Sequence, residues 1–250
     1  MSFIGVFDSG LGGLSILKHL HQQFPHEEFV YLADSQNIPY GEKNKDQLKE
    51  IFNRNINYFT KANGIVVACN TISSLIPEIK LSKIPLYSII DSIVQSYIQD
   101  FSNIKNVGIL ATSFTVEYQA YLNAFHRANF DINITQIAAS QLVPAIENNT
   151  ENIIEIANQY ITQFPNNIKH LILGCTHYNL LLEKFQLHYE NLTIINPYNG
   201  ITKQVLPIIS KNTTGSIKPL VFLTTKYSDN LQSISEEIMQ QNIVWQNISI

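Results

Sequence analysis

The sequence is poor in cysteine, arginine and charge, and each shortage argues against a class of protein. Only two cysteines occur in 250 residues, and only two of the 16 basic residues are arginines, Arg54 and Arg127. Charged residues make up 14% and the net charge is −4, so neither nucleic acid nor an anionic membrane is an expected partner. No apolar run approaches about 18 residues, and the N-terminus carries no basic signal-like segment, so the sequence predicts a cytoplasmic protein without a membrane span.

Short apolar runs alternate with segments of helical period along the chain. Strands are predicted at 3–9, 28–34, 64–70, 85–91, 106–112, 133–139, 170–176, 192–197 and 219–225, and helices at 9–21, 46–61, 116–128 and 152–164. Strands that are apolar on both faces and are separated by helices are typical of parallel sheets with helices on each side. We therefore predict an α/β fold.

The two halves of the chain are similar to each other. Gly5 and Gly108 hold the same place in two matching strands, and Cys69 and Cys175 each follow a small residue at the end of a later strand. The repeat predicts two similar lobes, one formed by residues 1–95 with 205–250 and the other by residues 96–204.

Each cysteine ends an apolar strand and precedes a helix, at the sheet edge where open α/β sheets bind ligands. The two cysteines could be small buried hydrophobes; a disulfide is disfavoured in the cytoplasm, and a zinc site would need further ligands. Their equivalent placement favours a cleft with one thiol on each side. A helix start is expected to lower a thiol pKa, and two opposed thiols suit removal of a proton from one face of a carbon and its return on the other. That reaction is racemisation or epimerisation.

Other polar residues follow the predicted strands. The loop from Asp8 to Gly13 could form an anion-binding nest or only a tight turn, and it matches neither common nucleotide-binding motif. Asn70, Thr71 and Thr176 are good helix caps that could also donate to a carboxylate, and His177 could move a proton near neutral pH.

Six segments resemble the glutamate racemase family of the aspartate/glutamate racemase superfamily. They are GVFDSGLGGLS, YLADSQNIPYG, VVACNTISS, VGILAT, LVPAIE and LGCTHY, in the family's order and spacing. The resemblance implies a cofactor-independent enzyme that interconverts L- and D-glutamate and supplies D-glutamate for peptidoglycan. It implies an active site between two α/β lobes, no metal, and it allows a homodimer.

The resemblance also implies roles for particular residues. Cys69 would deprotonate D-glutamate with the help of Asp8, and Cys175 would deprotonate L-glutamate with the help of His177. Substrate carboxylates and the amino group would be held by Ser9, Pro39, Tyr40, Gly41, Asn70, Thr71 and Thr176. Asp34 and Glu147 match acidic positions near the family's site.

Four residues depart from the family's usual pattern: Phe114, Tyr118, Asn179 and Asn196. They bring the second lobe's substrate contacts, and any subunit contacts, into question. Two other functions stay open at this stage, a racemase for aspartate or another amino acid and a two-lobed carboxylate-binding protein without turnover.

Overall fold

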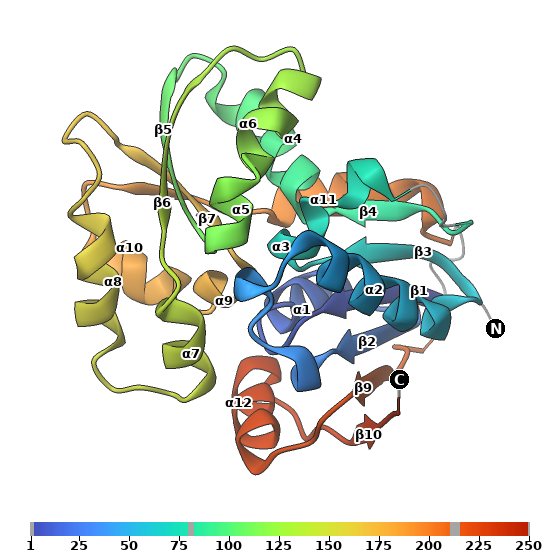
Figure 1. Cartoon of the computed structure of the whole chain (residues 1–250). Coiled ribbons are helices and arrows are strands. Elements are labelled where there is room, and N and C mark those ends of the chain that lie inside the picture. The colour runs from blue at the N-terminus through green and yellow to red at the C-terminus, as the bar shows by residue number, and fades with distance from the viewer. Residues whose placement is uncertain (1–2, 80–82, 211–215, 250) are drawn as a thin grey trace.

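The computed structural model describes residues 3–79, 83–210 and 216–249, and the strands of these residues form two parallel sheets (Figure 1). The larger sheet has the order β10-β9-β2-β1-β3-β4 and the smaller one the order β6-β5-β7-β8. The larger sheet contains β1 (Phe3–Asp8), β2 (Phe29–Ala33), β3 (Ala62–Val67), β4 (Leu86–Ser88), β9 (Leu220–Thr224) and β10 (Trp245–Asn247). The smaller sheet contains β5 (Asn106–Ala111), β6 (Asn133–Ala138), β7 (His170–Gly174) and β8 (Thr193–Ile195).

The two sheets share one connectivity, which confirms the predicted α/β fold with two similar lobes. The order β2-β1-β3-β4 in the larger sheet is repeated as β6-β5-β7-β8 in the smaller one. In each sheet the second strand lies on one side of the first strand, and the third and fourth strands lie on the other side. The connections therefore lead in opposite directions from the carboxyl ends of two neighbouring strands, which are β1 and β3 in the larger sheet and β5 and β7 in the smaller one. Such switch points are where open α/β sheets bind ligands.

Helices cover both sheets (Figure 1). The longer ones are α1 (Leu14–Gln23), α2 (Lys45–Asn55), α4 (Ile89–Phe101), α6 (Ala120–Arg127), α8 (Ile153–Ile161), α11 (Tyr198–Val205) and α12 (Asp229–Met239). The shorter ones are α3 (Asn70–Ser73), α5 (Ser113–Glu117), α7 (Leu142–Glu147), α9 (Thr176–Asn179) and α10 (Leu182–His188).

The largest hydrophobic cluster joins the two sheets. It contains Ile4 of β1 and Ile109 of β5, together with residues of α4 and α11. The predicted lobe limits at 95/96 and 204/205 lie inside these two helices, so the helices are shared by both halves. Beyond 205 the chain returns to the larger sheet, where β9 pairs with β2 and β10 pairs with β9.

Several element boundaries differ from the predictions for local physical reasons. The predicted strand 85–91 ends at Ser88, because the Ser88 side chain accepts a hydrogen bond from the Asp91 N–H and begins α4. The predicted helix 116–128 is divided into α5 and α6 by Gln119, whose φ of 51° is left-handed. The edge strand β10 was not predicted because its three residues, Trp245–Asn247, include only one apolar side chain.

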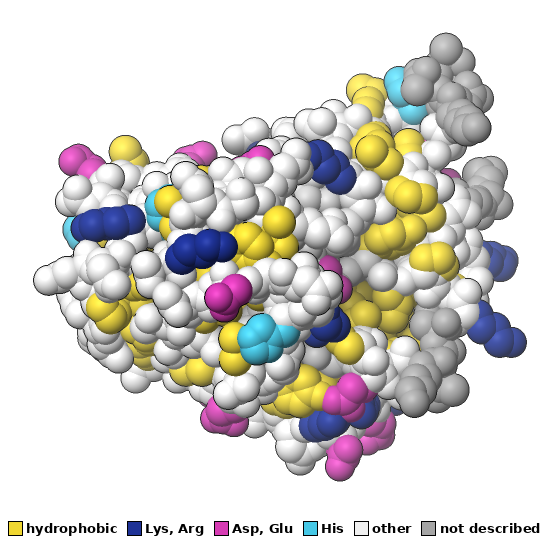
Figure 2. All heavy atoms as spheres, turned by 90° about the horizontal axis from the view of Figure 1, so that it is seen from above, with side chains coloured by type: hydrophobic (Ala, Val, Ile, Leu, Met, Phe, Trp, Pro, Cys, Tyr) yellow, Lys and Arg dark blue, Asp and Glu magenta, His cyan; other side chains and the backbone are white. Residues whose placement is uncertain are grey.

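None of the helices in the described part of the chain is long and apolar enough to cross a membrane. On the face shown in Figure 2, acidic and basic side chains are scattered among uncharged ones and do not gather into a patch of one sign.

Candidate active site

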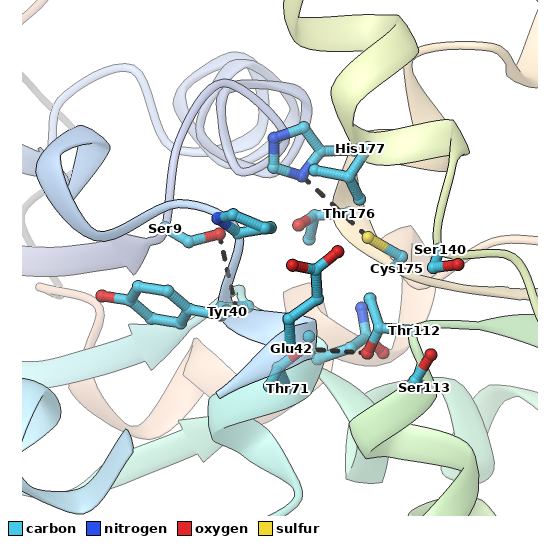
Figure 3. A pocket seen from close by; sticks show the side chains of 15 residues that line it. Ser9, Tyr40, Glu42, Thr71, Thr112, Ser113, Ser140, Cys175, Thr176 and His177 are labelled. Atoms are coloured by element: carbon cyan, nitrogen blue, oxygen red, sulfur yellow. Dashed lines mark hydrogen bonds between the residues drawn. The ribbon is translucent and has the colours of Figure 1, made fainter. Parts of the chain in front are cut away.

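One pocket lies where the carboxyl ends of the two sheets meet (Figure 3). It encloses about 440 Å³ of space between atoms, including the solvent at its mouth. Its lining consists of Ser9, Pro39, Tyr40, Gly41, Glu42, Cys69, Asn70, Thr71, Thr112, Ser113, Ser140, Val143, Cys175, Thr176 and His177. No lysine or arginine is among these residues, so an anionic ligand would be held by hydroxyls, amides and backbone N–H groups.

Both cysteines line this single pocket, from different sheets. Cys69 follows β3 and precedes α3, and Cys175 follows β7 and precedes α9. Their side chains are buried, with 4% and 6% exposure, and both thiols are free. The two strands that carry them are equivalents in the repeated topology. The pocket therefore has one thiol contributed by each lobe.

The surroundings of Cys69 correct one expectation from the sequence. Its thiol donates to Ser9 Oγ at 3.8 Å. Burial and the negative charge of Asp8 raise the pKa of Cys69, and these effects outweigh the backbone N–H of Ile72, which lowers it. The predicted lowering is wrong for this thiol because α3 has only four residues, and its N-terminal N–H groups do not compensate for the loss of water. Cys69 is thus held as a neutral thiol.

Cys175 stands at one end of a line of proton-carrying groups. His177 Nδ1 lies 4.0 Å from Cys175 Sγ, and His177 Nε2 lies 2.5 Å from Glu147 Oε1. Burial lowers the pKa of His177, but the contacts with Cys175 and Glu147 raise it to well above its ordinary value. For Glu147 burial alone would raise the pKa. The contacts with His177 and with the Leu11 N–H outweigh burial and bring the pKa of Glu147 below its ordinary value. The pair is therefore an imidazolium and a carboxylate.

The glycine loop after β1 does not serve as a nest for a ligand. The N–H groups of Gly10 and Gly13 donate to Asp8 Oδ2 at 3.2 and 3.0 Å, so these two donors are used by the protein's own carboxylate. Asp8 Oδ1 accepts from the hydroxyl of Thr176 at 3.0 Å. Asp8 is fully buried and is not part of the pocket lining, and burial raises its pKa. This carboxylate joins the β1 loop to the segment that carries Cys175, and it affects Cys69 through charge.

Asp34 also lies outside the pocket lining, where it anchors the loop that carries Pro39, Tyr40 and Gly41. Its carboxylate accepts from Tyr40 Oη at 2.5 Å, from Thr225 Oγ1 at 2.7 Å and from the amides of Asn37 and Asn55. The Pro39–Gly41 segment forms one wall of the pocket. Asp34 therefore positions this wall and ties it to the chain after β9.

Asn70, which lines the pocket, has an unused donor. Its Oδ1 accepts from Tyr121 Oη at 2.7 Å, whereas its Nδ2 is buried and makes no hydrogen bond within the described part of the chain. Next to it, Thr71 Oγ1 lies 3.1 Å from Thr112 Oγ1 on the other lobe. A buried amide donor without a partner is costly, so this group is suited to a ligand's oxygen.

Comparisons with known proteins agree with this geometry. A family model described as Asp/Glu/Hydantoin racemase matches residues 13–204. The chain belongs to this family. A protein named glutamate racemase 3 from Caldanaerobacter subterraneus is 30% identical, covering 99% of this chain and 94% of its own length. The glutamate racemase of Fusobacterium nucleatum is also 30% identical, with 96% and 95% covered.

A solved structure gives the same result for the fold. The crystal structure of a glutamate racemase from Francisella tularensis in complex with D-glutamate superimposes with a TM-score of 0.88 at 29% identity, covering 99% of this chain and 97% of that one. This chain is an amino-acid racemase, an isomerase.

The structure brings most of the predicted racemase residues together. Cys69, Cys175, His177 and all seven predicted substrate-contacting residues line the pocket, while Asp8, Asp34 and Glu147 stand behind it. Sequence reasoning missed Glu42, Thr112, Ser113, Ser140 and Val143. Thr112 and Ser140 follow β5 and β6, so a search of every strand's carboxyl end would have found both.

None of the four departures from the family pattern lines the pocket. Phe114 and Tyr118 stack on each other with ring centroids 5.3 Å apart and pack against the hydrophobic cluster of the larger sheet. Asn179 lies on the side of α9 that faces another cavity, and Asn196 accepts from the Tyr198 N–H at the start of α11.

Among the described residues, no group of three or more His, Cys, Asp or Glu side chains is arranged to hold a metal.

Proposed function

We propose that this racemase interconverts L- and D-glutamate, with Cys69 and Cys175 as the two bases. The observation that carries the proposal is that one thiol from each sheet lines the same pocket. The names of the relatives support glutamate as the substrate, since those that align along nearly the whole chain are called glutamate racemases. The D-glutamate product would enter peptidoglycan synthesis. The cytoplasmic location and a homodimer stay predictions.

Each turnover moves two protons. With L-glutamate bound, the Cys175 thiolate takes the α-proton, and the electron pair of the broken C–H bond spreads into the neighbouring carboxylate. The Cys69 thiol then gives its proton to the opposite face, which yields D-glutamate with Cys175 as thiol and Cys69 as thiolate. With D-glutamate the same steps run in reverse, and solvent exchange resets the two cysteines between turnovers.

The surroundings of the two thiols suit these roles. Cys69 is held neutral by burial and by the charge of Asp8, so it is ready to donate a proton. His177 lies beside Cys175 with Glu147 behind it, so the proton that Cys175 gains or loses has a nearby carrier. Microscopic reversibility requires each cysteine to work as a thiolate in one direction of the reaction and as a thiol in the other.

The pocket can hold the substrate's two carboxylates without a basic residue. Asn70 Nδ2 is a buried donor, and hydroxyls of both lobes surround the pocket, among them Ser9, Thr71, Thr112, Ser113 and Ser140. Hydroxyl donors fixed at the α-carboxylate would stabilise the charge that develops there when the proton leaves.

Polarimetry with purified protein and no added cofactor tests the proposal. Optical rotation of L-glutamate or D-glutamate should fall to zero, whereas L-aspartate and L-alanine should keep theirs. Loss of rotation with aspartate instead would change the substrate, and glutamate binding in calorimetry without any loss of rotation would indicate a carboxylate-binding protein.

Cysteine variants test the two bases. Cys69→Ala and Cys175→Ala should each lower racemisation by at least about a thousandfold, because neither remaining thiol can serve both faces of the α-carbon. Each variant keeps one base and is the other's control, and both should unfold at temperatures close to that of the wild type. Near-normal turnover in either variant would remove that cysteine from the mechanism.

A further inference from the structure

Tyr121 of α6 connects the two segments that carry the cysteines. It is fully buried, and its hydroxyl donates to Asn70 Oδ1, one residue after Cys69. Its ring packs against Gly174, the residue before Cys175, so closely that a Cβ at position 174 would lie 2.9 Å from Tyr121 Cε2. Tyr121 itself is not part of the pocket lining.

The direction of this hydrogen bond fixes the orientation of the Asn70 amide. Burial and the charge of Cys175 raise the pKa of Tyr121 to well above its ordinary value, so the phenol keeps its proton and can donate it. In this contact the phenol donates to Oδ1, so the NH₂ group of the Asn70 amide lies on the other side. The backbone of Asn70 is held separately, since its carbonyl accepts from Ser74 Oγ at 2.9 Å.

Without the phenol, the Asn70 amide could turn over with little local cost. The reversed amide would present its oxygen to the pocket, where a substrate carboxylate would be repelled instead of bound. The present orientation places a buried Nδ2 without a partner in the pocket lining, next to Cys69.

We propose that Tyr121 is a positioning residue, which holds the Asn70 amide with its N–H groups directed at a carboxylate of the substrate. This inference rests on the proposed function, because it takes glutamate as the ligand of the pocket. Tyr121 comes from the smaller-sheet half and Asn70 from the larger-sheet half, so the hydrogen bond also joins the two halves directly behind the substrate.

Steady-state kinetics of Tyr121→Phe test the proposal. The variant loses one oxygen atom and keeps the ring against Gly174. KM for both enantiomers of glutamate should rise about tenfold while kcat stays within about threefold, because the contact serves substrate binding in the ground state and in the transition state alike. Tyr97→Phe is the matched control: this buried tyrosine belongs to the same hydrophobic cluster and donates to the Ile104 carbonyl at 3.0 Å. The control should leave KM unchanged.

A double-mutant cycle separates positioning from a general loss of structure. If Tyr121 acts through Asn70, adding Tyr121→Phe to Asn70→Ala should raise KM by less than about twofold beyond the single Asn70→Ala variant. Additive effects on KM, or an unchanged KM in Tyr121→Phe, would overturn the positioning role of Tyr121. The proposed function would still stand in that case if the wild-type protein racemises glutamate. A wild-type protein that does not racemise glutamate would overturn both.

Discussion

The pair formed by His177 and Glu147 makes the stability of this racemase depend on pH in a defined way. Glu147→Gln keeps the shape of the side chain and removes its charge. The His177 side chain is 2% exposed and that of Glu147 is 21% exposed, so the variant leaves a buried imidazole without its counter-ion. Breaking a fully buried pair costs roughly 3–5 kcal/mol, and partial exposure of Glu147 with a hydrogen bond from His177 to the glutamine oxygen reduces this to about 2 kcal/mol.

The pH range of this penalty follows from the two pKa shifts. The pKa of His177 is raised in the folded state, so its contribution is complete below its ordinary value of 6.5 and is lost as the pH rises through the folded value. The pKa of Glu147 is lowered, so its contribution is complete above its ordinary value of 4.5 and is lost as the pH falls through the folded value. The difference between wild type and variant should therefore be largest between pH 4.5 and pH 6.5.

Urea unfolding measures this difference directly. We expect Glu147→Gln to lose about 2 kcal/mol at about pH 5.5 and progressively less at each step toward about pH 9. Glu155→Gln, the same substitution at an exposed position of α8, should cost less than about 0.5 kcal/mol throughout. A penalty for Glu147→Gln that is constant with pH, or that grows as the pH rises, would refute the ionised pair.

Two further substitutions and one rate of chemical labelling give further predictions. Gly12→Ala would place a Cβ 2.5 Å from the backbone nitrogen of His177, which cannot move aside, so we expect a loss of about 3 kcal/mol in urea unfolding; an unchanged midpoint would contradict this packing. Thr225→Val removes the hydroxyl that donates to Asp34, which anchors the Pro39–Gly41 wall of the pocket. We therefore expect a loss of about 2 kcal/mol in unfolding free energy and a higher KM for glutamate. An unaltered KM would show that this contact of the chain after β9 does not affect substrate binding. Because burial raises the pKa of Cys69, iodoacetamide should modify it at least about tenfold more slowly than free cysteine at about pH 8, as followed by peptide mass spectrometry, and a faster rate would show an ionised thiol.

The sequence predicted those features that depend on repeated local patterns. Apolar strands separated by helices gave the fold class, and the matching places of Cys69 and Cys175 indicated that each lobe contributes a thiol to one cleft. Strand ends were reliable guides because parallel strands present all their carboxyl ends at one edge of the sheet.

Contacts between distant segments were not predictable in the same way. The loop from Gly10 to Gly13 has the composition of an anion nest, but Asp8 uses the N–H groups of Gly10 and Gly13 and Glu147 uses that of Leu11, which only the folded structure reveals. The thiol pKa of Cys69 was misjudged because the sequence shows a helix start and does not show burial. The hydrogen bond from Tyr121 to Asn70 joins residues 51 positions apart and leaves no local pattern.

The central claim is that two thiols act on opposite faces of one α-carbon, and racemisation in deuterium oxide tests it most directly. We predict that L-glutamate yields D-glutamate carrying one deuterium at the α-carbon, while the L-glutamate recovered early in the reaction stays unlabelled, and that the mirror result holds from D-glutamate. Product that retains its original α-proton, or substrate labelled as quickly as product, would contradict the two-base account.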